Sequence, residues 1–103
     1  MNESEFLNIS DALFDRIEAA LDAAELDLDI DRNGNVMEIE FDDGAKLIIN
    51  RHLPNAEIWV AARSGGFHYR LRNGAWCNTR DEGDLFAQLG ELIKAHAGQA
   101  PGF

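Results

Sequence analysis

Hydrophobic side chains in the first quarter of the chain recur at the three- and four-residue spacing of one helical face. The pattern predicts a helix with Ser4 as its N-cap. Its buried face comprises Phe6, Ile9, Leu13, Ile17, Ala20/Leu21 and Ala24. The opposite face carries five carboxylates at spacings of four, three, four and three, which line up along the helix. They are Asp11, Asp15, Glu18, Asp22 and Glu25, and are called the acidic stripe below.

The pattern changes to alternation after the helix. Asp27, Asp29 and Asp31 alternate with Leu28 and Ile30, which predicts a strand with its acids on one face. Four turn signals of the hairpin type then divide the middle of the chain. The strands they predict cover 36–41, 46–51, 57–63, 67–72 and 75–78.

A second helix closes the chain. Asp81 is its predicted cap, with Asp84 at the third helical position, and Gly98 and Pro101 end it. Its buried stripe comprises Leu85/Phe86, Leu89, Leu92/Ile93 and His96. The order helix, strands, helix predicts a single α+β domain over residues 1–103, with both helices on one face of an antiparallel sheet. This two-layer sandwich leaves the other sheet face, the open face, toward solvent.

Charge is distributed unevenly over the 103 residues. The formal net charge is −10, and residues 1–31 hold ten acids but only one base, Arg16. Such a surface repels DNA and anionic membranes and favours cations or basic partners. The single cysteine, Cys77, excludes an intrachain disulfide and a Cys-rich zinc site. The start has no signal-peptide pattern and no apolar run is long enough for a membrane span, so we expect a cytoplasmic protein.

The stripe and the alternating acids together form a candidate metal site. One interpretation is a solvated face that maintains solubility. The other is a site for a cation or a basic partner, because like charges four residues apart on a helix destabilise it. Carboxylates suit hard cations such as Mg²⁺, Ca²⁺, Mn²⁺ and iron, held loosely. This acidic ridge comprises Asp11, Asp15, Glu18, Asp22, Glu25, Asp27, Asp29 and Asp31.

A calcium-loop motif overlaps the ridge. The spacing Asp29-x-Asp31-x-Asn33-Gly34-x₅-Glu40 satisfies the EF-hand pattern. An EF-hand requires a helix after its loop, whereas residues 37–41 alternate as a strand does. The motif therefore remains an alternative that its context opposes.

Trp59 is a candidate contact residue. If Ile58 and Val60 face the helices, Trp59 lies on the open face, where an exposed tryptophan is a favoured hot spot for protein contacts. The alternative is the inverted register, with Trp59 in the core. No histidine is placed beside a nucleophile in a way that predicts catalysis, and Cys77 has no activating partner nearby in the sequence. The histidines are His52, His68 and His96.

The chain resembles the frataxin family, specifically its bacterial CyaY type. The resemblance spans almost the whole chain and rests on SEFLNISDALFDRIEAALD, DLDID, KLIINRHLP, EIWVAARSGGFHYRL, WCNTR and LFAQLGELI. Its most specific part runs from Ile49-Asn50-Arg51 through Pro54 and the Trp59 segment to Gly65-Gly66. Two departures are Ala19 and Ala23, where some relatives carry further acids. Glu57 is a third, since glutamine is common there.

The resemblance implies an α–β sandwich that binds ferrous and ferric iron weakly on its acidic ridge; other divalent cations can substitute. It implies docking on a cysteine desulfurase and its iron–sulfur scaffold complex, regulation of cluster formation and iron donation. It assigns the ridge acids except Asp15, which the spacing adds, and three sheet-face partner residues, Asn50, Arg51 and Trp59. We expect a monomeric binding protein rather than an enzyme. Iron-dependent oligomers and a ferroxidase are the alternatives.

Overall fold

The structure is a computed structural model that describes residues 1–26 and 28–103. Its elements follow one another as helix, six strands and helix. They are α1 (Glu3–Ala23), β1 (Asp29–Asn33), β2 (Val36–Glu40), β3 (Lys46–His52), β4 (Glu57–Ala62), β5 (Gly65–Arg72), β6 (Ala75–Asn78) and α2 (Leu85–Ala97). The strand ends differ from the predicted ones by at most two residues.

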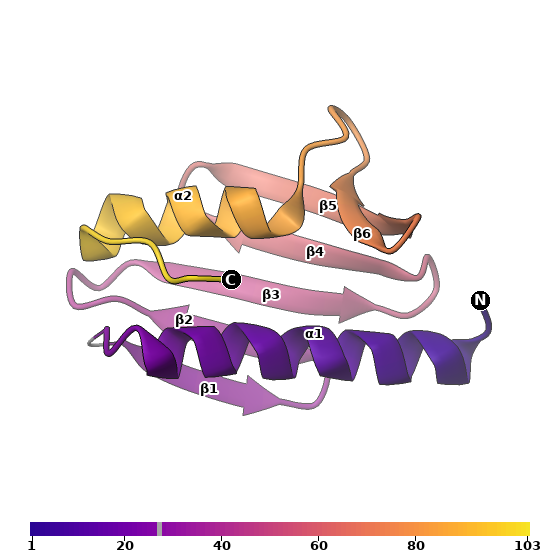
Figure 1. Ribbon diagram of the computed structural model, residues 1–103, viewed down its shortest axis with the longest axis horizontal. Coiled ribbons are helices and arrows are strands. Elements are labelled where there is room, and N and C mark those ends of the chain that lie inside the picture. The colour runs from indigo at the N-terminus through magenta and orange to yellow at the C-terminus, as the bar shows by residue number, and fades with distance from the viewer. Residues whose placement is uncertain (27) are drawn as a thin grey trace.

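The six strands form one antiparallel sheet in the order β1-β2-β3-β4-β5-β6, each paired with its neighbour in sequence. Both helices lie on the same face of this sheet, with α1 over the β1–β2 side and α2 over the β4–β5 side (Figure 1). The predicted α+β two-layer sandwich is confirmed. The chain after α2 turns back and runs between the two helices.

The core lies between the helices and the sheet, and strand alternation decides which side chains reach it. Met37 and Ile39 of β2 are fully buried, and the same face continues through the other strands. The further sheet residues buried there include Leu47, Ile49, Ile58, Val60, Tyr69 and Trp76. The helices contribute Phe6, Leu13, Phe14, Ile17, Leu21, Leu85, Leu89 and Ile93. The intervening strand residues form the open face.

The helix caps differ from the predicted ones. Asn2 caps α1, because its side-chain oxygen accepts a hydrogen bond from the Glu5 amide at 2.8 Å. Asp84 caps α2 by accepting from the Ala87 amide at 3.1 Å. The predicted caps Ser4 and Asp81 were wrong, since a cap-type residue lay close by and only the backbone geometry selects between them. Within the described ranges, neither helix is long and apolar enough to cross a membrane.

A tight hairpin occupies the predicted calcium loop. β1 and β2 pair through Asn33↔Val36, with Gly34 in the left-handed region at φ 60°. Residues 36–40 of the loop form strand β2, and the next element is strand β3 rather than the helix that an EF-hand needs after its loop. The calcium-loop interpretation is therefore wrong.

The two candidate caps of α2 can be separated by mutation. We expect Asp84→Ala to lower the free energy of unfolding by about 1 kcal/mol, because it leaves an amide of the first turn without its acceptor. Asp81→Ala is the matched control and should cost less than half as much. Urea unfolding followed by circular dichroism measures both, and equal losses would contradict the assignment of Asp84.

Candidate functional site

The first half of the acidic stripe lies against arginine side chains from the sheet. Arg32 of β1 faces the helices and approaches three stripe acids. Its guanidinium lies 2.6 Å from Asp15, 3.6 Å from Glu18 and 3.8 Å from Asp11. The hydrogen bond to Asp15 is the largest contribution that raises the pKa of Arg32 above its usual value, although desolvation opposes it. We call Asp11, Asp15 and Glu18 the compensated half.

Arg51 of β3 also contacts the compensated half, from the side of α1 that faces the sheet. Its side chain is only 8% exposed and contacts Asp11 at 2.5 Å and the Ser10 hydroxyl at 3.1 Å. It also donates to the Asn35 side chain at 3.1 Å and, at longer range, to backbone oxygens of α1 and the β1–β2 turn. The prediction that Arg51 lies on the open sheet face was wrong. It follows Leu47 and Ile49 at period two and therefore faces the helices.

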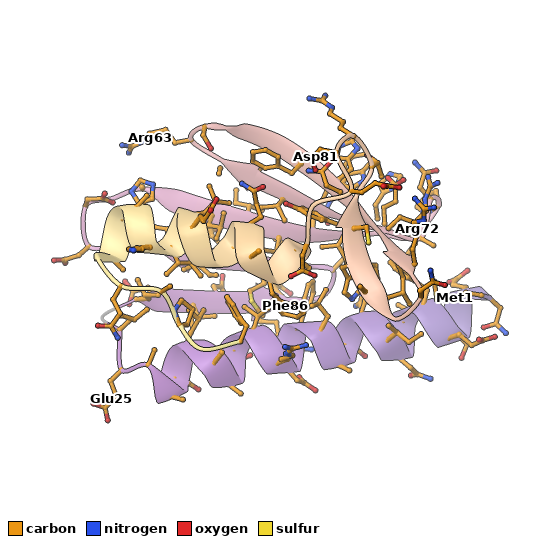
Figure 2. The ribbon with its side chains drawn as sticks, turned by 45° about the horizontal axis from the view of Figure 1, so that its top comes forward. Met1, Glu25, Arg63, Arg72, Asp81 and Phe86 are labelled. Carbon is orange, nitrogen blue, oxygen red and sulfur yellow. The ribbon has the colours of Figure 1, made fainter. Side chains whose placement is uncertain are left out.

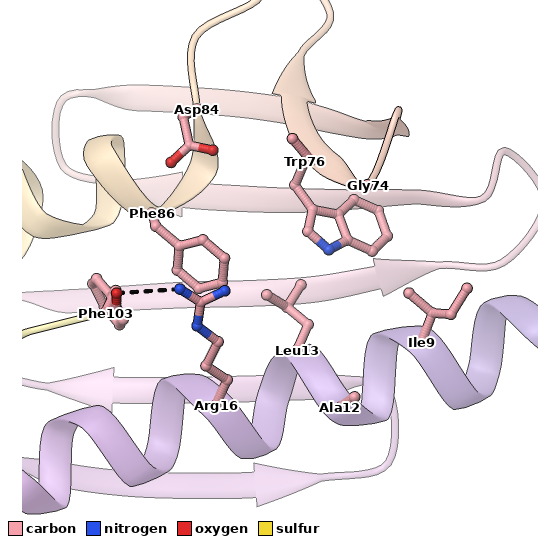
Figure 3. Close-up of a pocket in the computed structure, with 10 residues that line it drawn as sticks. Ile9, Ala12, Leu13, Arg16, Gly74, Trp76, Asp84, Phe86 and Phe103 are labelled. Carbon is pink, nitrogen blue, oxygen red and sulfur yellow. Dashed lines mark hydrogen bonds between the residues drawn. The ribbon is translucent and has the colours of Figure 1, made fainter.

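Arg16 does not neutralise the stripe, although it is the one base among residues 1–31. Its guanidinium lies 3.9 Å from the centre of the Phe86 ring and donates to the backbone oxygen of Phe103 at 3.1 Å. Figure 3 shows it pointing from α1 toward α2 and the segment that follows it. It lines a cavity of about 480 Å³ between these elements. Compensation of the ridge thus comes from the sheet and not from α1 itself.

The second half of the stripe has no such partners. Among residues 1–26 and 28–103, no basic side chain forms an ion pair with Asp22 or Glu25, and the last turn of α1 contains no base. Carboxylates at the C-terminal end of a helix oppose its dipole. The predicted place of Glu25 on the helical stripe was wrong, because α1 ends at Ala23 and Glu25 follows its cap with a φ of 53°, in the left-handed region where glycine or asparagine is favoured. Its side chain extends from the end of α1 away from the sheet (Figure 2). We call Asp22 and Glu25 the uncompensated half.

The strand acids lie on the other side of the edge strand. Asp29 and Asp31 are exposed and face away from the helices, opposite Glu40 and Glu38 of β2. Like charges directly opposite each other destabilise a strand pair. Lys46 of β3 offsets part of this repulsion, because it forms an ion pair with Glu38 at 2.8 Å and lies directly opposite Glu40. The ridge therefore wraps around the β1 edge instead of forming one continuous face. The remaining predicted acid of the ridge, Asp27, lies outside the described residues.

The described acids do not converge into an enclosed metal site. Within residues 1–26 and 28–103, no group of three or more His, Cys, Asp or Glu side chains is placed to hold a metal ion together. The carboxylates are instead strung along α1 and across β1 and β2. A cation drawn to this surface would keep much of its water and bind loosely.

The open face carries Trp59 between two histidines. The predicted register of β4 is confirmed, because Ile58 and Val60 are buried under the helices and Trp59 lies on the opposite side. Its ring stacks on His52 at 3.9 Å between centroids and on His68 at 4.2 Å, with interplanar angles of 9° and 6°. Asn50, the other predicted open-face residue, lies directly opposite Trp59 on β3. Trp59 is thus half-buried rather than fully exposed.

Glu57 holds the edge of this stack. It is 4% exposed, accepts a hydrogen bond from the indole Nε1 of Trp59 at 2.9 Å and another from Arg70 at 2.8 Å. Burial alone would raise the pKa of Glu57, but the hydrogen bonds from Trp59 and Arg70 outweigh it and hold that pKa below its usual range. The carboxylate is therefore a structural anion that fixes the indole edge.

The remaining candidates have ordinary surroundings. His96 lies 2.8 Å from Asp43 and stacks on Phe41, 4.9 Å between ring centres. Cys77 is half-buried, and its sulfur lies 3.7 Å from the Ala75 carbonyl oxygen. In the part of the chain that the structure describes, no base is hydrogen-bonded to Cys77 that would activate it as a nucleophile.

Four residues near the candidate site were not predicted as site residues from the sequence: Arg32, Glu57, His52 and His68. Arg32 alternates with Ile30 and could have been placed on the helix-facing side by period two. The stack depends on cross-strand register, which aligns Trp59 with His68. The lengths of the turns restrict that register. No pattern in the sequence, however, indicates how the three rings are oriented once the strands are paired.

Comparison with known proteins identifies the class. The frataxin-like domain matches residues 1–99. The chain is 53% identical over 100 residues to the iron-sulfur cluster assembly protein CyaY of Chromobacterium violaceum, covering 97% of this chain and 95% of that protein. The CyaY protein of Neisseria meningitidis serogroup B is 48% identical over 100 residues, with 97% and 94% covered.

Solved structures agree. Frataxin from Psychromonas ingrahamii superposes with a TM-score of 0.94 at 34% identity, covering 98% of this chain and 96% of that one. Trimeric frataxin from the yeast Saccharomyces cerevisiae, complexed with ferrous iron, gives 0.71 at 26% identity, covering 96% and 88%. The fold and site thus define a frataxin-like α–β sandwich. The chain belongs to the frataxin family, and its resemblance to the bacterial CyaY type is confirmed.

The buried position of Arg51 predicts a structural role. We expect Arg51→Met to lower the free energy of unfolding by about 2–3 kcal/mol, because Asp11, Asn35 and backbone oxygens lose a charged donor. Asp11→Asn is the control and should cost about 1 kcal/mol or less, since Asp11 is half exposed. Urea unfolding at pH 7 tests both, and an Arg51→Met variant as stable as the wild type would contradict this role.

The lowered pKa of Glu57 predicts a pH dependence of stability. Its stabilising contribution is fully present above the pKa it has when unfolded, about 4.3, and is lost as the pH falls through the lower folded value. We expect Glu57→Gln to cost about 1–2 kcal/mol at pH 7 and clearly less near pH 3.

Urea unfolding at several pH values measures the Glu57 difference. Glu82→Gln is the control: Glu82 pairs with Arg72 at 2.7 Å, but its side chain is 71% exposed. Its effect should stay small at every pH. A Glu57→Gln cost that does not change with pH would rule out the anionic anchor.

Proposed function

We propose that this chain is an iron-binding accessory protein of iron–sulfur cluster assembly. It docks on a cysteine desulfurase and its scaffold complex and regulates cluster formation, and it can donate iron. This function rests on family membership and on the names of the curated relatives, which are iron-sulfur cluster assembly proteins. We place it in the cytoplasm as a monomer; the trimeric yeast relative makes iron-dependent oligomers the alternative.

The observation that carries the proposal is the uncompensated half of the stripe. Asp22 and Glu25 lie where the helix dipole disfavours anions, and Glu25 adopts a backbone conformation that disfavours its side chain. A solvated face that served only solubility would not need acids at these positions. A ligand that relieves the repulsion accounts for them, and iron or a basic protein surface supplies the required positive charge.

The two halves of the ridge then have different roles. The compensated half holds α1 on the sheet through Arg32 and Arg51. The uncompensated half, with Asp29 and Asp31 across the edge strand, attracts iron and the basic partner. Because both ligands use the same charges, they compete unless the partner leaves some carboxylates free.

The open face offers a second contact surface. Asn50 and Trp59 lie side by side across β3 and β4, beside the exposed apolar side chains Ile48 and Val36. An aromatic centre with an apolar border is typical of protein contact sites. We assign this face, without Arg51, to docking on the complex.

A ferroxidase is the alternative, and it has less support. Di-iron oxidation in helical bundles uses carboxylates and histidines that converge from several helices. The described ridge acids lie on one helix and one edge hairpin. Oxidation of Fe²⁺ by the purified protein, measured against buffer, distinguishes the two functions. A rate well above buffer would support catalysis.

Two matched double variants test the division of the ridge. Asp22→Asn/Glu25→Gln should weaken binding to the desulfurase complex several-fold while leaving the unfolding free energy unchanged or slightly higher. Asp15→Asn/Glu18→Gln should lower that free energy by about 0.5–1 kcal/mol, because Arg32 loses two of its three acidic partners. Affinity is measured by titration at two salt concentrations.

The salt series supplies the control. If the uncompensated acids steer docking, raising the salt should weaken the wild type more than the Asp22→Asn/Glu25→Gln variant. If that variant instead loses stability and keeps full affinity, the uncompensated half is structural and the proposed docking surface is wrong.

A further inference from the structure

Trp59 has less freedom than a contact tryptophan usually has. Both faces of its indole are covered, by His52 at 3.9 Å and by His68 at 4.2 Å between ring centres. Its Nε1–H is bound to Glu57 at 2.9 Å. In this arrangement only an edge of the ring is available to a partner. A hot-spot tryptophan contributes most when its large ring surface enters a pocket of the partner.

The two covering rings differ in their surroundings. His52 is the inner ring, and its Nδ1 is buried with no hydrogen-bond partner within the described part of the chain. His68 is the outer ring, with 47% of its side chain exposed. A proton from solvent therefore reaches His68 readily, whereas a charge on His52 would be left without an acceptor.

The charged groups around His68 respond to its protonation. The Nδ1 of His68 lies 3.9 Å from the Glu57 carboxylate, which stays ionised at neutral pH because its pKa is lowered. Arg70, on the same strand, already pairs with Glu57 at 2.8 Å and opposes a second positive charge. From β6, the residue opposite Arg70 is Cys77. The contacts that favour protonated His68 are thus Glu57 and the indole face.

We propose that His68 is a proton-operated lid on Trp59: when protonated it closes over the indole and weakens docking through the open face. An imidazolium over an indole face gains a cation–π attraction that a neutral imidazole lacks, worth about two- to fivefold in the ratio of closed to open lid. The proposal rests on the assignment of the open face to docking.

The first experiment uses the free protein. The indole Nε1–H resonance of Trp59 is followed by NMR from pH 5 to 8, with the only other tryptophan, Trp76, as the internal reference. We expect the Trp59 signal to titrate together with His68 and the Trp76 signal to stay nearly constant. A His68→Phe variant keeps a stacked ring without a proton and should abolish the titration. A flat Trp59 profile in the wild type would overturn the lid.

The second experiment measures affinity for the cysteine desulfurase complex at pH 6.0 and 7.5. We expect the ratio of wild-type to His68→Thr affinity to fall about two- to fivefold from pH 7.5 to 6.0, because threonine suits a strand but cannot cover the indole. His68→Phe should show no such change relative to His68→Thr. His96→Asn, a histidine paired with Asp43 away from the stack, should behave as the wild type. A change in the charge of the partner between the two pH values affects all variants equally and therefore cancels in these ratios.

The outcomes separate the two claims. If the Trp59 signal titrates but the affinity ratio is the same at both pH values, the lid exists and its control of docking is wrong. If no variant binds the complex at either pH, the proposed docking function fails and the control of docking fails with it. The free-protein titration decides the existence of the lid in either case.

Discussion

The contact between α1 and the two arginines beneath it organises this molecule. α1 carries four aligned carboxylates, Asp11, Asp15, Glu18 and Asp22, which repel one another, and burying its apolar face brings those charges close to the sheet. Arg32 and Arg51 project from the helix-facing side of β1 and β3 to meet them, at 2.6 Å from Asp15 and 2.5 Å from Asp11. The helix is therefore fixed on the sheet by charge as well as by its apolar stripe. The arginines reach only the first half of the acids.

This limited reach gives the surface its functional division. The same strand alternation that turns Arg32 and Arg51 toward α1 turns Asp31 and Trp59 to the open face. One sheet thus stabilises the fold with one side, and we propose that its other side carries the contact residues. Among the ridge acids that the structure describes, those without an ion-pair partner lie at the C-terminal end of α1 and on the outer side of β1, where a cation or a basic surface could reach them together.

Local patterns in the sequence were sufficient for the elements and their order. Period 3.6 and the turn signals predicted both helices and the hairpins, because these features depend on neighbouring residues. The caps at Asn2 and Asp84 were missed because two cap-type residues stood close together in each case. The family resemblance does not distinguish the two faces of β3, whereas the alternation of Arg51 with Leu47 and Ile49 places it under α1.

Contacts between residues far apart in the sequence could not be predicted from such local patterns. The pairing of Arg32 with Asp15 joins residues 17 positions apart, so the stripe looked uncompensated throughout in the sequence. The three-ring stack joins β3, β4 and β5 and depends on side-chain conformations that composition does not specify. Charge counts along the chain therefore overestimated the free charge of the ridge, and only the structure shows which acids are available.

The most direct test of this division is an anaerobic titration with Fe²⁺, followed residue by residue by NMR. The account predicts that line broadening centres on Asp22, Glu25, Asp29 and Asp31 and spares Asp11 and Asp15, which the arginines already occupy. Broadening centred on Asp11 and Asp15, or equal along the whole of α1, would contradict it.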